Sequence, residues 1–115
     1  MIKLVGLYKR KPGMTPDEFR SYYEQHHAPL VMELLPQVRR YRRSYMTEQY
    51  LTNTFAEPTW FDVIQETWFE SLEQYEELLK MLQDPTLTRL IADDEAKFMD
   101  LSARQMFIME EYVSG

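Results

Sequence analysis

The chain of 115 residues has no cysteine and only three glycines, at Gly6, Gly13 and Gly115. The absence of cysteine excludes disulfides, thiol nucleophiles, iron–sulfur clusters and thiolate zinc sites. Three scattered glycines exclude a glycine-rich loop that would cradle phosphate groups. The longest strictly apolar run near the carboxyl end covers residues 106–109, which is far too short for a membrane span. We therefore expect neither thiol chemistry, nor a nucleotide loop, nor a membrane partner.

Positive charge is also scarce, because 13 basic residues are outnumbered by 19 acidic ones and the net charge is −6. Nucleic-acid binding needs clustered positive charge, so this balance predicts no nucleic-acid partner. The arginine cluster of this chain is Arg39, Arg40, Arg42 and Arg43, which would alternate between the two faces of a strand. We interpret these arginines as protecting an edge strand or pairing with acids across a dimer.

The amino terminus lacks the charge order of a secretory signal, because Lys9, Arg10 and Lys11 follow the apolar residues 1–8 instead of preceding them. We therefore expect a cytoplasmic protein. The length fits one domain, residues 1–115, with no room for a second. Apolar residues make up 44% of the chain and aromatic residues 14%, so the chain has enough material to bury a core.

Turn and cap signals divide the chain into strands and helices. Residues 2–9, 38–49, 61–69 and about 103–113 have the composition of strands. A first helix begins at Thr15-Pro16-Asp17-Glu18, and two more begin at Ser71 and at Asp84-Pro85. Pro29 should kink or end the first helix near residues 26–28. The order β-α-β-β-α-α-β predicts an α+β, ferredoxin-like split βαβ fold with a four-stranded antiparallel sheet and one extra helix.

The predicted strands carry apolar side chains on both faces, whereas a sheet covered on one face should alternate apolar and polar residues. Leu4 and Val5 point in opposite directions in the first strand, as Val63 and Ile64 do in the third. Two apolar faces need two covers. The second cover is either a further helix or loop, or a second copy of the chain packed sheet against sheet. We favour the homodimer, because an exposed apolar face of that size would aggregate.

Several segments of the chain resemble the EthD domain family. They are Leu7-Tyr8-Lys9-Arg10-Lys11-Pro12-Gly13, Phe19-Arg20-x-Tyr22-Tyr23, His27-Ala28-Pro29-Leu30-Val31, Phe61-Asp62, Trp68-Phe69 and Glu110-Glu111. The resemblance implies a dimeric α/β barrel, in which two ferredoxin-like sheets face each other, and a ligand cavity between helices and sheet. It implies a small aromatic, polyketide-like or ether-derived substrate. It also matches His27 to the histidine of that family.

His27 is the residue that we predict to carry the chemistry, because helical spacing places it on the same inward face as Phe19 and Tyr23. An imidazole can take or give a proton near neutral pH. The other interpretation is a core histidine that is bonded to a neighbouring carbonyl or tyrosine. His26 lies about 100° further round the helix and should face solvent.

Tyrosines form the second group of candidates, because a tyrosine in a pocket can hold a substrate oxygen. Many tyrosines, however, only fill space and leave the hydroxyl in water. We predict His27, Tyr23 and Tyr45 as catalytic residues. The predicted substrate-binding residues are Tyr8, Phe19, Tyr41, Asp62 and Trp68.

Three carboxylates lie among apolar positions, namely Asp62, Glu66 and Asp94. Each would either orient His27 through a hydrogen bond or form an ion pair with the arginines at 39–43 or with Arg104. Adjacent histidines such as His26 and His27 do not both face one ion from a regular helix. We therefore predict no metal site and no cofactor.

The favoured function is an enzyme for a small hydrophobic substrate, with His27 moving a proton and Tyr23 or Tyr45 holding an oxygen. The reaction stays open between a cofactor-free, monooxygenase-like oxidation with dioxygen, an oxidation carried out by a partner oxidase, and a cyclase, isomerase or lyase reaction. The alternative is a non-catalytic accessory or ligand-binding protein of an oxidation or degradation pathway.

Overall fold

The computed structural model of the chain describes residues 1–38, 40–47 and 60–115. Its strands form one four-stranded antiparallel sheet with the order β2-β3-β1-β4. This is the predicted ferredoxin-like α+β arrangement, and the extra helix is present. In chain order the elements are β1 (Ile2–Tyr8), α1 (Pro16–Tyr22), the π-helix η1 (Tyr23–His27), α2 (Ala28–Leu34), β2 (Arg40–Tyr45), β3 (Val63–Phe69), α3 (Leu72–Met81), α4 (Pro85–Glu95), the 3₁₀ turn η3 (Leu101–Ala103) and β4 (Gln105–Glu110).

The strands are shorter than the sequence pattern suggests. β3 begins at Val63 instead of residue 61, and β4 follows a 3₁₀ turn that occupies residues 101–103. β2 is an edge strand, as its arginines indicate. Arg43 has an acidic partner within its own chain, with 2.6 Å between its Nη2 and Glu24 Oε1. Arg39 lies outside the described residues.

The helix that carries the candidate histidine begins as predicted. Thr15 Oγ1 accepts a hydrogen bond from the Glu18 amide at 3.1 Å, and Glu18 Oε1 accepts one from the Thr15 amide at 2.9 Å. Pro16 occupies the first turn, where its missing N–H costs nothing. These contacts satisfy amides that a helix start would otherwise leave without partners.

This helix does not end at Pro29, although a proline inside a helix usually ends it. Instead, the turn before Pro29 widens into a π-helix, in which the Ala28 amide donates to the Tyr23 carbonyl five residues earlier. The wider turn accommodates a residue that has no N–H, so the helix continues to Leu34. Of the two outcomes expected near residues 26–28, a kink or an end, the structure shows a local distortion of the helix and no end.

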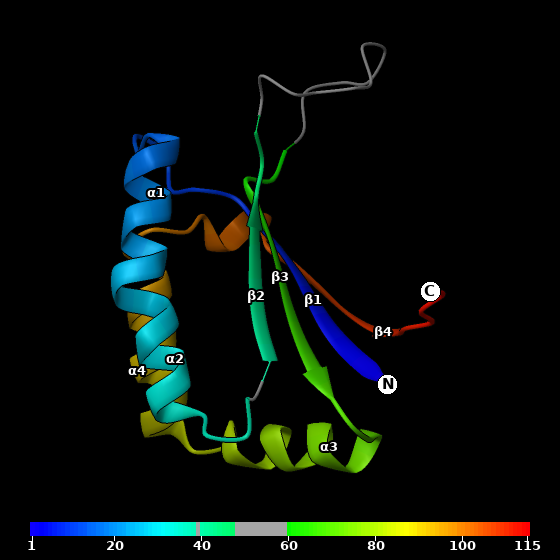
Figure 1. The fold of residues 1–115 in the computed structure, drawn as a ribbon. Coiled ribbons are helices and arrows are strands. Elements are labelled where there is room, and N and C mark those ends of the chain that lie inside the picture. Colours follow the sequence, from blue (N-terminus) through cyan, green and yellow to red (C-terminus); the bar gives the residue numbers. More distant parts are fainter. Residues whose placement is uncertain (39, 48–59) are drawn as a thin grey trace.

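The helices lie on one face of the sheet, as Figure 1 shows. α1, η1 and α2 follow one another in a single column with α4 next to α2, and α3 crosses one end of the sheet. Leu4 and Val63 face this helical layer, where Leu4 lines a cavity and Val63 joins the core. The strand register places Val5 and Ile64 on the opposite face. No helix of the described residues is long and apolar enough to cross a membrane.

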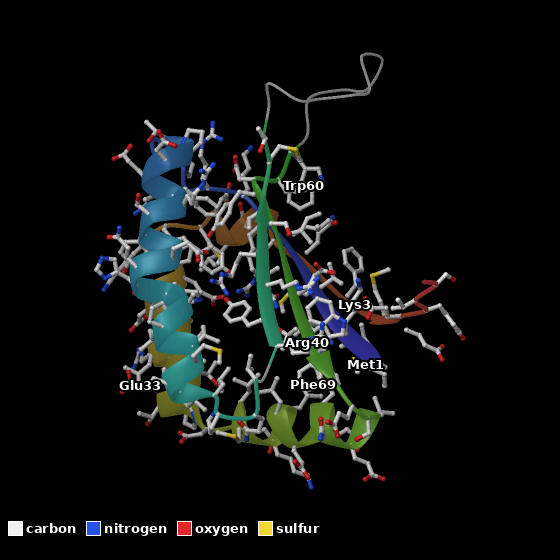
Figure 2. All side chains as sticks on the ribbon, in the orientation of Figure 1. Met1, Lys3, Glu33, Arg40, Trp60 and Phe69 are labelled. Carbon is white, nitrogen blue, oxygen red and sulfur yellow. The ribbon has the colours of Figure 1, made fainter. Side chains whose placement is uncertain are left out.

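The face turned away from the helices, which we call the outer face, is only partly apolar. Trp68 lies there with 6% of its surface exposed, because Lys3, Arg40 and Arg42 lie over its ring at 5.6, 4.9 and 5.1 Å. Its Nε1 donates to Glu111 at 2.7 Å. Figure 2 shows Lys3 and Arg40 close together in this region. The outer face thus carries the expected apolar side chains, but one corner of it is charged. The apolar remainder consists of Val5, Leu7, Ile64, Phe107 and Met109.

Phe98 lies at the centre of an aromatic cluster that supports the histidine helix. It is completely buried, and its ring centroid lies 5.6 Å from that of Phe19 and 5.1 Å from those of Tyr22 and Tyr23. The His27 ring lies 4.9 Å away. Because these rings come from two segments far apart in sequence, Phe98 fixes the histidine helix against the end of α4.

We expect Phe98→Ala to lower the free energy of unfolding by about 3–5 kcal/mol, because it removes a fully buried ring and leaves a cavity. Urea unfolding followed by circular dichroism measures the change. The matched control is Leu90→Ala on α4, whose side chain is half exposed and whose loss should stay within about 0.5 kcal/mol. Equal losses in both variants would contradict the central place of Phe98.

Candidate functional site

A cavity of about 280 Å³ lies between the helical layer and the sheet. Leucine, valine and isoleucine side chains from the helical layer and its connecting segments make up much of its wall, together with Leu4, Ala92 and Met106. The polar part of the wall includes Tyr8, Tyr23, His27, Tyr41, Gln65 and Glu95. An apolar cavity with a few converging polar groups is the usual form of a small-molecule site. The resemblance to known sequences implied a cavity in this place.

The π-helix presents both of its buried residues to the interior. Tyr23 and His27 are 0% and 2% exposed, and their rings meet edge to face at 5.5 Å between centroids. His26 is exposed and lies against the ring of Tyr22 at 4.9 Å, so its predicted orientation toward solvent is confirmed. The local sequence thus places one histidine of the pair in the cavity wall and the other at the surface.

Asp94 on α4 orients His27. The His27 Nδ1 and Asp94 Oδ2 atoms are 2.8 Å apart, and Tyr22 donates its hydroxyl hydrogen to Asp94 Oδ1 at 2.5 Å. Burial raises the pKa of Asp94, but the hydrogen bonds from Tyr22 and His27 outweigh it, so the pKa lies below its usual value. An ionised Asp94 keeps a hydrogen on Nδ1 of His27. The Nε2 atom has no hydrogen-bond partner among the described residues, and the His27 side chain forms part of the cavity wall.

Of the three carboxylates considered as partners of His27, the structure brings only Asp94 to it. Asp62 pairs with Arg10, with 2.5 Å between Oδ1 and Nη1, and Glu66 pairs with Lys3 at 2.8 Å. Neither ion pair uses the arginines that the sequence suggested. Asp94 occupies the apolar stripe of its helix, which is the one sequence signal that distinguishes it from the other two.

Tyr23 and Tyr41 form a pair of hydroxyl groups in the cavity wall. Their oxygens are 2.9 Å apart, and the bond between them uses only one of the two hydroxyl hydrogens. Burial raises the pKa of Tyr41 to about 12 and that of Tyr23 well above its usual value, so both hydroxyls stay protonated at neutral pH. The pair can therefore donate one hydrogen bond to an oxygen in the cavity.

Tyr8 is a second donor, directed by Gln65. In the orientation that satisfies both ends of its amide, Gln65 donates from Nε2 to the Tyr8 hydroxyl oxygen at 3.1 Å and accepts from the Thr67 hydroxyl. The Tyr8 oxygen thus receives a hydrogen from the protein and keeps its own to donate. Burial raises the pKa of Tyr8, which keeps that hydrogen in place at neutral pH.

Glu95 and Arg104 complete the polar part of the wall, and sequence reasoning missed their place in it. Arg104 Nη1 lies 3.0 Å from Glu95 Oε1, so the two charges compensate each other. Asp94 and Glu95 are neighbours in sequence, yet they serve different partners because successive helix positions lie about 100° apart. The position of Arg104 along the chain did not indicate that its side chain pairs with Glu95 at the cavity wall.

Four predicted site residues do not line this cavity. Phe19 is 1% exposed and packs in the aromatic cluster, and Asp62 is held by Arg10. Trp68 lies on the outer face, because its position in β3 alternates with that of Thr67. Tyr45 directs its hydroxyl to Glu24 at 2.5 Å. The cavity therefore contains His27, Tyr23, Tyr8 and Tyr41 of the predicted set.

Residues 11–102 of the chain match the EthD domain family. A conidial pigment biosynthesis dehydratase EthD of Metarhizium robertsii is 30% identical, over 92% of this chain and 80% of the relative. Dehydratase ustZ of Ustilaginoidea virens is 29% identical, over 86% of this chain and 75% of the relative. Decarboxylase claH of Passalora fulva is 28% identical, over 90% of this chain and 73% of the relative.

Solved structures agree on the fold. An EthD-like protein of Ralstonia eutropha superimposes with a TM-score of 0.71 at 21% identity, covering 99% of this chain and 94% of that one. An EthD family protein of Bacillus halodurans gives a TM-score of 0.65 at 22% identity, covering 97% and 99%. A Bacteroides fragilis protein described as dimeric and ferredoxin-like gives 0.59 at 10% identity, covering 96% and 95%.

The lowered pKa of Asp94 predicts how stability depends on pH. A carboxyl with a lower pKa in the folded chain adds stability above its unfolded pKa of about 3.9, and that stability is lost as the pH falls through the folded pKa. We expect Asp94→Asn to reduce the loss of unfolding free energy between about pH 6 and pH 3. The exposed neighbour Asp93 supplies the control, Asp93→Asn. The same pH dependence in Asp94→Asn and wild type, measured by urea unfolding, would refute the assignment.

Proposed function

Because this chain belongs to the EthD domain family, we propose that it catalyses proton transfer on a small, uncharged, oxygenated molecule bound in the cavity, with His27 as the acid and base. The preferred reaction is an elimination of water. The observation that carries the proposal is the buried His27, which lines the cavity and is held by Asp94 at one ring nitrogen, so that the other is left to act on a ligand.

The arrangement of groups fits each step of such an elimination. His27 Nε2 takes a proton from a carbon next to a carbonyl group, and the electron pair of that C–H bond forms an enolate. The shared hydroxyls of Tyr23 and Tyr41 donate to the enolate oxygen. When the enolate collapses, the hydroxyl group on the next carbon leaves and takes the proton back from the imidazolium as water. The product is a carbonyl conjugated with a new C=C bond, and His27 is regenerated.

The charges in the cavity wall favour a neutral substrate. Arg104 is compensated by Glu95, and the tyrosines stay protonated. An anionic ligand would have to compete with Glu95 for the guanidinium. The volume of about 280 Å³ lies at the small end of ligand pockets, which favours a molecule of one or two rings over a larger one.

The names of the relatives support a lyase-type reaction, since two are dehydratases and one is a decarboxylase. Loss of carbon dioxide also produces an enolate, which the same tyrosine pair would hold and His27 would protonate. A cofactor-free oxidation or a role beside a partner oxidase would use the same cavity. The second candidate is an accessory protein that binds the ligand without turnover, and the experiment below separates it from the enzyme.

We expect His27→Ala to lower kcat/KM by roughly 10²–10⁴-fold, the range for loss of a general acid–base group. Candidate substrates are β-hydroxy carbonyl compounds with one or two rings, screened by mass spectrometry for loss of water. The matched control is Gln25→Ala, which removes an exposed side chain of the same π-helix and should keep wild-type turnover. Equal turnover in both variants would remove His27 from the mechanism, and binding without turnover by wild type would favour the accessory protein.

A pH profile gives an independent check on His27. If His27 is the base, turnover should fall as the pH drops through the range in which histidines titrate, roughly pH 5–8. The imidazole is then protonated on Nε2 and has no lone pair for the substrate. A rate that is flat over this range would contradict the proposed base.

We also propose that the chain forms a homodimer through the outer face, as the dimeric ferredoxin-like neighbours suggest. Phe107 and Met109 on β4 are 46% and 48% exposed, and they adjoin Val5 and Leu7 of β1. One face of a four-stranded sheet can supply the roughly 800 Å² per partner of a standard interface. The charged corner around Trp68 carries both signs, so a partner can compensate it.

We expect Val5→Glu or Ile64→Lys to shift the dimer to monomer or to aggregates, because each places a charge on the outer face. Sedimentation at micromolar concentration measures the change. Leu90→Glu on the far side of α4 is the control and should leave the dimer intact. Leu4→Glu and Val63→Lys face the helices and should unfold the chain instead. A compact wild-type monomer of 13.9 kDa would refute the dimer.

A further inference from the structure

The geometry assigns Tyr22 as a positioning residue for His27, acting through Asp94. This inference rests on the proposed function, in which His27 needs a free lone pair on Nε2. Tyr22 does not line the cavity. It reaches the histidine only through the carboxylate, with Tyr22 bonded to Asp94 Oδ1 and His27 bonded to Asp94 Oδ2.

A carboxylate that is held at one oxygen can still rotate about its bond to the chain. Asp94 is held at both oxygens, at 2.5 Å by Tyr22 and at 2.8 Å by His27. The hydroxyl of Tyr22 therefore decides which way the carboxylate plane faces. With that plane fixed, Oδ2 accepts the hydrogen of Nδ1, and the lone pair of the neutral ring lies on Nε2.

Another group competes for the same carboxylate. The Nζ atom of Lys97 lies 4.0 Å from Asp94 Oδ1, and its side chain is 65% exposed. Without the Tyr22 hydroxyl, Lys97 and water would reach Oδ1 and draw the carboxylate toward the surface. Asp94 also lies in the last turn of α4, where the helix dipole disfavours a negative charge. The bond from Tyr22 offsets part of that cost.

The ring of Tyr22 is itself held in place by packing, so its hydroxyl can hold the Asp94 carboxylate in one orientation. It packs on Phe98 at 5.1 Å and on His26 at 4.9 Å between centroids. Tyr22→Phe keeps both ring contacts and removes only the hydroxyl. This variant therefore separates the hydrogen bond from the packing.

The test reads the tautomer of His27 directly and needs no substrate. Nitrogen-15 NMR distinguishes a neutral imidazole with its hydrogen on Nδ1 from one with its hydrogen on Nε2. For wild type we expect the hydrogen on Nδ1. We expect Tyr22→Phe to populate the Nε2–H form measurably, and Asp94→Asn to change the ring nitrogens at least as much. Wild-type ring shifts in Tyr22→Phe would overturn the inference.

The control is Tyr45→Phe, because Tyr45 makes a bond of the same kind to a carboxylate, 2.5 Å from Glu24, but away from Asp94. It should leave the His27 tautomer unchanged. A shift of the His27 ring nitrogens as large as that in Tyr22→Phe would show a general effect of losing a tyrosine hydroxyl, and would also overturn the inference.

Turnover then separates the two proposals. On the substrate found by screening, we expect Tyr22→Phe to lower kcat by about tenfold with little change in KM, the lower end of the 10–100-fold effect that outer partners of metal-bound histidines have. If His27→Ala is inactive and Tyr22→Phe has wild-type kcat, the positioning role fails and the proposed function stands. If His27→Ala keeps its activity, the proposed function fails, whatever the ring nitrogens report.

Discussion

The contact between His27 and Asp94 is the constraint on which the site depends. It joins the helix column on one side to α4 on the other, and its 2.8 Å bond ties residues 67 positions apart in the chain. Because the imidazole is almost fully buried, an unpaired Nδ1 would cost free energy, so the pair also holds the two helices in register. Phe98, packed on both His27 and Tyr22, gives this contact a rigid base.

The cavity combines an apolar wall with a few oriented hydroxyl donors. Its apolar wall comes mostly from the helices and the segments that follow them, with Leu4 and Met106 added by the sheet, while its donors come from β1, β2 and the π-helix. Each donor hydroxyl has an oxygen already engaged by the protein, either by a second tyrosine or by Gln65. Such groups are pre-oriented, so little reorganisation is needed when charge develops on a bound oxygen.

Local signals predict much of the fold. Three helix starts are marked by signals that involve only residues a few positions apart. They are the capping box of Thr15 and Glu18, the N-cap at Ser71 and the proline that follows Asp84. At Pro29 the local rule predicts either a kink or an end of the helix, and it does not decide between them. Packing of Tyr23 and His27 into the core makes the wider π turn preferable to an end, and that packing is not visible in local sequence.

The sequence alone predicts the order of the elements, the inward face of the first helix and the choice of His27 and Tyr23 as candidate site residues. Each of these depends on the spacing of residues along one element. Only the tertiary structure selects Asp94 over Asp62 as the partner of His27, and Tyr41 over Tyr45 as the hydrogen-bond partner of Tyr23. It also places Trp68 outside the cavity and brings Arg104 to its wall. These choices depend on contacts between residues that are distant in the chain, and the spacing of residues within one helix or strand does not reveal such contacts.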